Sequence, residues 1–209
     1  MLKRNLVLGG FMALFALLVV FSSCNKDDEN ITNQTDCSLT PEQIDGIQYM
    51  REEEKLARDV YHFLSEKWNV QVFSNIEKSE QNHMDQLLSL VVSCEIDDYV
   101  LPGYGEFTNP HIQDLYDLLT AKGSLSLKDA LEVGATIEDV DIYDLEEFAL
   151  ETDNETLLDI YESLTCGSRN HMRSFVNQLN IIGAEYTPQY ISQAEYESIL
   201  DGDHEKCAQ

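Results

Sequence analysis

Apolar residues recur at steps of three and four along most of the chain, a period that predicts amphipathic helices. Thr40 and Asn154 stand where helices are expected to begin, and Pro41 occupies a first helical position. Strand-like alternation is nearly absent, so we expect an all-α protein. The segments with helical periodicity are 41–68, 73–93, 111–121, 126–148, 154–179 and 192–200.

The helices fall into two pairs separated by a long connection that is rich in proline and glycine around residues 102–110. This order predicts a four-helix bundle with a long crossover that contains a short extra helix. We expect the bundle to span residues 40–186, followed over 187–209 by a short helix and a tail.

The first 24 residues have the organisation of an export signal. Lys3 and Arg4 precede the apolar stretch 6–21, and Ser22, Ser23 and Cys24 follow it. A transmembrane helix is the alternative, but it usually needs about 20 apolar residues and does not end on small residues and a cysteine. The run 20–24 (VFSSC) resembles the lipobox of bacterial lipoproteins.

That resemblance implies cleavage after residue 23 and attachment of lipid to Cys24. Polar residues 24–39 then form a flexible linker to the bundle. We expect a location in the cell envelope, on the outer membrane. The run 26–29 (KDDE) resembles a signal that sends some lipoproteins to the outer surface, so both the periplasmic and the surface-exposed side remain open.

The charge of the chain restricts its partners. It has 39 acidic and 13 basic residues, for a formal net charge of −26. Such a surface repels nucleic acid, so we exclude a DNA- or RNA-binding role. It attracts cations, which is compatible with metal binding. The sequence does not indicate an oligomeric state.

Four further cysteines, Cys37, Cys94, Cys166 and Cys207, have no zinc-type spacing. An exported compartment permits disulfides, and all three pairings of four cysteines are possible. Cys37 and Cys207 lie near the two ends of the bundle and are candidates to join them.

Six polar residues interrupt the apolar stripes of the predicted helices. Burying one unpaired carboxylate costs several kcal/mol, so a group of them facing one interior requires compensating cations. Imidazole and carboxylate ligands from facing helices are typical of di-iron or di-manganese sites. The candidate metal ligands are Glu54, Glu80, His83, Glu138, Asp141 and His171.

The alternative is that these residues are exposed, since a helix boundary displaced by one position would turn several outward. Acids are so frequent that an acid three residues before a histidine carries no weight alone. Glu52 and Glu53, next to Glu54, are expected to be solvated. The other histidines, His62, His111 and His204, are expected to face solvent.

Several short motifs resemble those of known ferritin-like proteins. The run 54–61 (EKLARDVY) resembles the first-helix motif of the rubrerythrin group, and 79–83 (SEQNH) resembles its second-helix ExxH. The segments 130–145 and 167–171 (GSRNH) extend this likeness. With them, residues 41–180 are similar to the ferritin-like family catalogued as domain of unknown function 2202.

The resemblance implies that Glu54, Glu80 and His83 bind one metal, with Glu80 bridging to a second that Glu138 and His171 bind. Ferritin-like sites usually carry a second ExxH on the fourth helix, where this chain has Ser168. A bridging carboxylate is therefore missing unless Asp141 replaces it, and one metal, or none, is also possible.

Two functions follow from these observations. The first is an envelope-anchored metal-dependent oxidoreductase that uses iron, possibly as a di-iron centre, or manganese for Fe(II) oxidation or peroxide reduction. The second is a non-catalytic binding or structural module with a vestigial or structural metal site. Tyr61 lies on the stripe of Glu54 and can relay an electron or merely pack. No catalytic residue is assigned.

Overall fold

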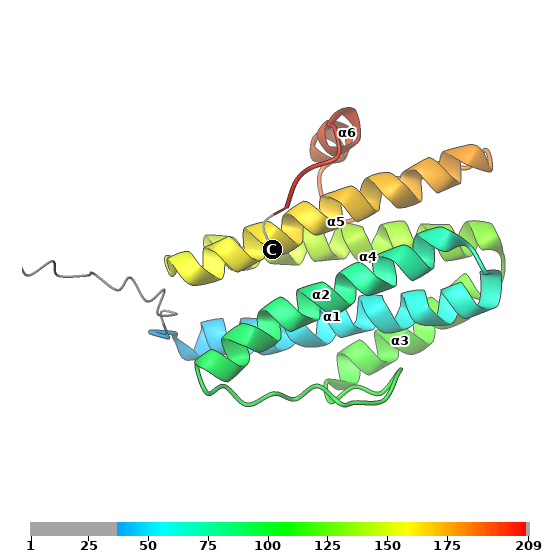
Figure 1. The fold of residues 1–209 in the computed structure, drawn as a ribbon. Helices are drawn as coiled ribbons and strands as arrows, with labels where there is room; N and C mark the ends of the chain where they lie inside the picture. The colour runs from blue at the N-terminus through cyan, green and yellow to red at the C-terminus, as the bar shows by residue number, and fades with distance from the viewer. Residues whose placement is uncertain (1–36, 208–209) are drawn as a thin grey trace, which may run out of the picture. The chain divides into compact units, whose positions relative to one another are not determined.

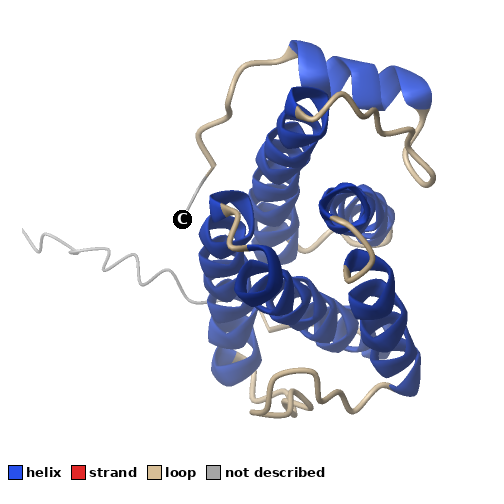
Figure 2. Ribbon diagram, turned by 90° about the vertical axis from the view of Figure 1, so that its right-hand side faces the viewer, coloured by secondary structure: helices blue, strands red, loops and turns tan. Residues whose placement is uncertain are grey.

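The computed structural model describes residues 37–207, and every regular element among them is a helix. The predicted all-α class is confirmed (Figures 1 and 2). The predicted export signal, the predicted lipidation site Cys24 and the predicted linker up to residue 36 lie outside the described residues. Over the described range, no helix combines the length and apolarity needed to span a bilayer. The helices are α1 (Pro41–Trp68), α2 (Gln71–Ser93), α3 (Pro110–Gly123), α4 (Leu127–Leu150), α5 (Glu155–Ile181) and α6 (Gln193–Asp201).

Local capping explains where the helices begin. Thr40 forms a capping box with Gln43 at the start of α1, and Pro41 follows it. The side chains of Ser126 and Asn154 accept hydrogen bonds from the first turns of α4 and α5. These are the starts that the sequence predicts.

The bundle is built from two helical pairs. Helices α1 and α2 pack along each other, and α4 packs along α5, while α3 lies against α1 and α4 (Figure 1). Asn69, in the left-handed region at φ 51°, lets the chain reverse between α1 and α2 within two residues. The long connection 94–109 and α3 form the predicted crossover.

The interior contains two apolar clusters. On α1, for example, Ile47 and Met50 belong to one cluster, whereas Leu56 and Val60 belong to the other. The same division recurs on α2, α4 and α5, so each of the four helices has a short stretch between the two clusters. The predicted ligand positions fall in or beside these stretches.

Buried charges hold the crossover against the bundle. Lys55 and Asp59 are fully buried and paired with each other. The Lys55 ammonium also donates to the carbonyl of Gly103, and Asp59 accepts from the backbone N–H of Gly105. The motif that resembles a metal-binding helix therefore also anchors a loop.

The expectation that Glu52 and Glu53 are solvated is wrong. Glu52 is 4% exposed and accepts from the backbone N–H groups of Thr108 and Asn109. Glu53 is 3% exposed, and burial raises its pKa well above the ordinary value, reinforced by the charge of Asp144. The crossover covers Glu52, and Glu53 lies beside Asp144 of α4, so both are buried by segments that are distant in the sequence.

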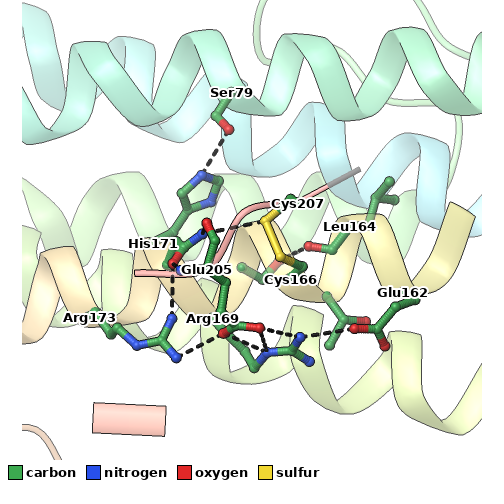
Figure 3. The surroundings of a disulfide bond; sticks show 12 residues. Ser79, Glu162, Leu164, Cys166, Arg169, His171, Arg173, Glu205 and Cys207 are labelled. Carbon is green, nitrogen blue, oxygen red and sulfur yellow. Dashed lines mark hydrogen bonds and ion pairs between the residues drawn. A yellow bond between two sulfur atoms is a disulfide. The ribbon is translucent and has the colours of Figure 1, made fainter. Parts of the chain in front are cut away.

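Two disulfides join Cys37 to Cys94 and Cys166 to Cys207. The suggested link between Cys37 and Cys207 is therefore wrong. The first disulfide ties the start of α1 to the end of α2. The second ties the C-terminal tail to the middle of α5 (Figure 3).

Candidate metal centre

All six candidate ligands lie inside the bundle. Glu54 comes from α1, Glu80 and His83 from α2, Glu138 and Asp141 from α4, and His171 from α5. None is more than 7% exposed. The alternative that a displaced helix boundary turns them outward is thereby wrong.

Five of the six form two overlapping groups. Glu54, Glu80 and His83 form one, and Glu80, Glu138 and His171 form the other. In each group one potential ligand atom from every residue lies within 4.8 Å of the others. Ligand atoms on opposite sides of one ion lie about 4 Å apart, so each group has the size of a metal site.

Glu80 is common to both groups, and each of its oxygens faces a different histidine. Its Oε2 lies 2.8 Å from His83 Nδ1, and its Oε1 lies 2.9 Å from His171 Nδ1. His83 Nδ1 is also 3.1 Å from Glu54 Oε2, and His171 Nδ1 is 3.3 Å from Glu138 Oε2. A carboxylate in this position can bridge two cations.

Unsatisfied polar atoms are concentrated in this cluster. Among the residues that the structure describes, the buried side-chain nitrogens and oxygens without a hydrogen-bond partner belong to six residues, all in or beside the cluster. Four of these seven atoms, both oxygens of Glu80, Oε2 of Glu138 and Nδ1 of His171, lie only in ion pairs within the cluster. Buried polar groups are normally satisfied, so such a concentration needs an explanation. The six are Glu53, Glu54, Glu80, Glu138, Asp141 and His171.

The pKa values of the buried groups show that the cluster requires positive charge. Burial raises the pKa of Glu54 to about 7, although the neighbouring His83 favours the charged carboxylate. Burial also opposes the charge of Glu80, but His171 and His83 hold its pKa below the ordinary value. Burial disfavours the charged form of His171, yet Glu80 and Glu138 raise its pKa to about 10. Without a metal, protonated imidazoles compensate the carboxylates.

Asp141 lies beside the two groups and belongs to neither. Its Oδ2 accepts from the Ser168 hydroxyl at 2.8 Å, and its Oδ1 has no hydrogen-bond partner. Ser168 occupies the position at which a second ExxH would carry its glutamate. The Ser168–Asp141 contact thus links α5 to α4 where a bridging carboxylate is expected.

Sequence reasoning missed two residues that position the histidines. Ser79 Oγ lies 2.9 Å from Nε2 of His171 and can fix the orientation of that ring. A Cβ at Gly167 would lie 2.4 Å from His83 Nε2, so only glycine leaves room for the ring. A glycine on α5 opposite a histidine of α2 could have indicated this role. It can be recognised only once the pairing of the helices is known.

The structure places the other residues named from the sequence as follows, and an electron-relay role of Tyr61 stays a prediction. Tyr61 packs against Phe175 at 5.2 Å between ring centroids, and its hydroxyl donates to Glu138. His111 and His204 are exposed, as expected. His62 is half-buried and lies 2.9 Å from Glu77, so the expectation of a solvent-facing side chain is only partly correct.

We expect Asp141→Asn to stabilise the metal-free protein. Burial raises the pKa of Asp141 well above its usual range, and the charges of Glu54 and Glu53 raise it further. The amide removes this repulsion and can still accept from Ser168. Thermal unfolding without metal should show a rise of a few degrees, at about 2–4 °C per kcal/mol for a chain of this size, and metal binding should persist.

Asp139 is the matched control, because it is also buried on α4 but fully satisfied. It accepts from the Tyr186 hydroxyl and from the backbone N–H groups of Gln189 and Ile191. Asp139→Asn should therefore lower the melting temperature. Equal shifts for the two variants would contradict this assignment of repulsion to Asp141.

The stability of the metal-free protein should fall as the pH rises. A group whose pKa is higher in the folded than in the unfolded state stabilises the fold below its unfolded-state pKa. This contribution is lost as the pH rises through its folded-state pKa. For Glu54 this loss occurs between pH 4.5 and about pH 7, and for His171 between pH 6.5 and about pH 10. A metal competes with protons, so its binding strengthens over the same range. The gap in melting temperature between Mn(II)-loaded and metal-free protein should widen with pH, and a constant gap would contradict this.

Comparison with known proteins supports the same fold over most of the chain. The profile of a family described as an uncharacterized protein domain (DUF2202) matches residues 43–203. The uncharacterized protein MJ0754 of Methanocaldococcus jannaschii is 52% identical over 169 residues, which cover 80% of this chain and 91% of that protein. The crystal structure of the hypothetical protein MJ0754 from Methanococcus jannaschii superposes with a TM-score of 0.79 at 52% identity, covering 80% of this chain and 96% of that one.

Proposed function

The chain belongs to the DUF2202 family, and we propose that it is a metal-binding protein whose bundle holds two divalent cations on either side of Glu80. Glu54, Glu80 and His83 bind the first cation, and Glu80, Glu138 and His171 bind the second. The concentration of unsatisfied buried atoms in this one cluster carries the proposal. Burial without a cation would be unfavourable for three carboxylates whose charges are opposed by only two imidazoles.

The ligand set favours iron or manganese. Carboxylates and imidazoles on facing helices suit Fe(II) and Mn(II), whereas the groups contain no thiolate. A Glu-x-x-His pair projecting inward from α2 and glutamates from α1 and α4 match the arrangement in ferritin-like di-iron carboxylate bundles. We therefore propose a ferritin-like fold for this domain.

The finer proposal is an oxidoreductase acting in Fe(II) oxidation or peroxide reduction. Two ferrous ions would supply the two electrons that, with two protons, reduce one hydrogen peroxide to two water molecules. Glu80 holds the two positions together, Ser79 orients His171, and the Tyr61 hydroxyl orients Glu138. Apolar clusters flank the carboxylates on both sides along the bundle.

The location remains a proposal from sequence. The lipobox-like run at Cys24 supports a lipid anchor on the outer membrane, with the polar linker holding the bundle beside the bilayer. Whether the bundle faces the periplasm or the outside is open. Electrons for a redox cycle would then come from the envelope or from Fe(II) itself.

A non-catalytic module with a structural metal is the second candidate. The observation that favours it is Ser168, whose hydroxyl donates to Asp141 where a ferritin-like centre would carry another carboxylate. With this contact the site has three carboxylates and two imidazoles in its two groups. Such a centre can fix helix packing without turning over a substrate.

Metal analysis of protein purified without chelator tests the proposed function. We expect stoichiometric iron or manganese in the parent protein and its loss in His83→Ala, since His83 contacts both Glu54 and Glu80. His111→Ala, which changes an exposed histidine of α3, is the control and should retain the metal. Metal-free parent protein whose melting temperature does not change in His83→Ala would contradict the proposal.

A further inference from the structure

A cleft of about 370 Å³ opens between α2 and α5 and reaches the edge of the candidate centre. His83 and His171 form part of its wall. Both rings face the carboxylates with Nδ1, so the cleft meets the histidine side of the centre. Ser79 and Gly167, which position the two rings, also line it. A molecule in this cleft would approach the centre past the imidazoles.

The lining of the cleft is rich in polar side chains, and it is almost uncharged when a cation is bound, since imidazoles bind metal in the neutral form. Apart from the histidines, Glu205 is its one ionisable carboxylate or cation, in a chain of net charge −26. The other polar side chains are amides and hydroxyls such as Asn75, Asn82 and Ser174. Such groups donate and accept hydrogen bonds but carry no charge to balance that of an ion. The lining therefore suits a small uncharged solute.

The C-terminal tail lines the cleft with His204, Glu205 and Cys207 and is held at several points (Figure 3). The Cys166–Cys207 disulfide ties it to α5. Glu205 pairs with Arg169 at 2.6 Å and with Arg173 at 2.8 Å, and these pairs neutralise the carboxylate. These contacts lie within about one turn of His171 on the same helix. The tail is thus fixed beside the histidine it covers.

We propose that this cleft is the entrance through which a small uncharged hydrogen-bonding solute reaches the centre, and that the disulfide-pinned tail over 204–207 sets its width. The inference rests on the proposed function, because it assigns the substrate class of the same centre. The other disulfide, Cys37–Cys94, is not part of the cleft lining and does not affect the width of the entrance.

The access test uses metal-free protein, so it does not depend on the proposed function. Deuterium exchange at the histidine C2–H, followed residue by residue by mass spectrometry, reports how freely solvent reaches each ring. Cys166→Ser with Cys207→Ser should accelerate exchange at His83 and His171 several-fold and leave the exposed His111 unchanged. Cys37→Ser with Cys94→Ser is the matched control and should leave both rates unchanged.

A second variant, Glu205→Ala, loosens the tail with both disulfides intact and should accelerate the same two histidines. Unchanged rates in Glu205→Ala and in the Cys166 and Cys207 variant, with each protein folded by circular dichroism, would overturn the role of the tail. If the rates rise but no variant or parent protein binds metal, the proposed function alone fails.

The solute class is tested with two oxidants on the Fe(II)-loaded protein. Each oxidant's rate with the bound iron is divided by its rate with free Fe(II) in solution. We expect this normalised rate to be higher for hydrogen peroxide than for the peroxydisulfate dianion. The measurement is made at high ionic strength, where repulsion by the acidic surface is screened. Equal normalised rates would overturn the assignment to an uncharged solute.

Discussion

Glu80→Gln is expected to abolish metal binding at both positions of the centre. Glu80 belongs to both groups, and each of its oxygens faces a different histidine. The amide retains the size of the side chain but loses the charge and one acceptor oxygen. Since loss of an outer-shell partner alone typically costs roughly 10–100-fold in metal affinity, we expect more than about 100-fold here. Titration of metal-free protein with Mn(II), followed by calorimetry, measures this loss.

Glu52→Gln is the matched control for this variant. Glu52 is also a buried glutamate of α1, but it faces the crossover and accepts from the backbone N–H groups of Thr108 and Asn109. Its substitution should lower stability and leave the Mn(II) affinity close to that of the parent. Retention of both metal positions in Glu80→Gln would show that the bridging assignment is wrong.

Asp59→Ala is expected to cause the largest loss of stability without loss of metal binding. It leaves the Lys55 ammonium fully buried with only the Gly103 carbonyl as a hydrogen-bond acceptor. It also removes the acceptor for the Gly105 N–H, which holds the crossover. Removing one partner of a buried ion pair typically costs about 3–5 kcal/mol. Urea unfolding should show this decrease in the free energy of unfolding.

The pair Lys128–Glu132 provides the control for this experiment. It has the same four-residue spacing on a helix, but the two side chains are 54% and 20% exposed. Exposed pairs of this kind contribute about 0.3–0.5 kcal/mol, so Glu132→Ala should have little effect. If the two substitutions have equal effects, burial of the Lys55–Asp59 pair is not what stabilises the crossover.

Much of the fold follows from the sequence, because helical periodicity and capping residues are local signals. Thr40, Asn154 and the three- and four-residue apolar steps are sufficient to locate the helices. The same periodicity identifies Glu80 and His83 as one inward-facing pair. Candidate ligands could therefore be found without knowing which helices pack together.

Other features depend on contacts between distant segments and could not be predicted. Glu52 is buried because the crossover folds over α1, and no local pattern encodes that cover. Glu138 and Asp141 share a face of α4, yet only Glu138 reaches His171, because Asp141 lies about one turn further along the helix and contacts Ser168 instead. The disulfide partners likewise depend on how the helices pair and on where the C-terminal tail lies against α5.

The central claim is that the buried cluster binds two cations on either side of Glu80. Anomalous X-ray diffraction from crystals of the Mn(II)-loaded protein tests it most directly. We expect two peaks, one among Glu54, Glu80 and His83 and one among Glu80, Glu138 and His171. Absence of anomalous density from both groups, or manganese confined to acidic surface residues, would contradict the claim.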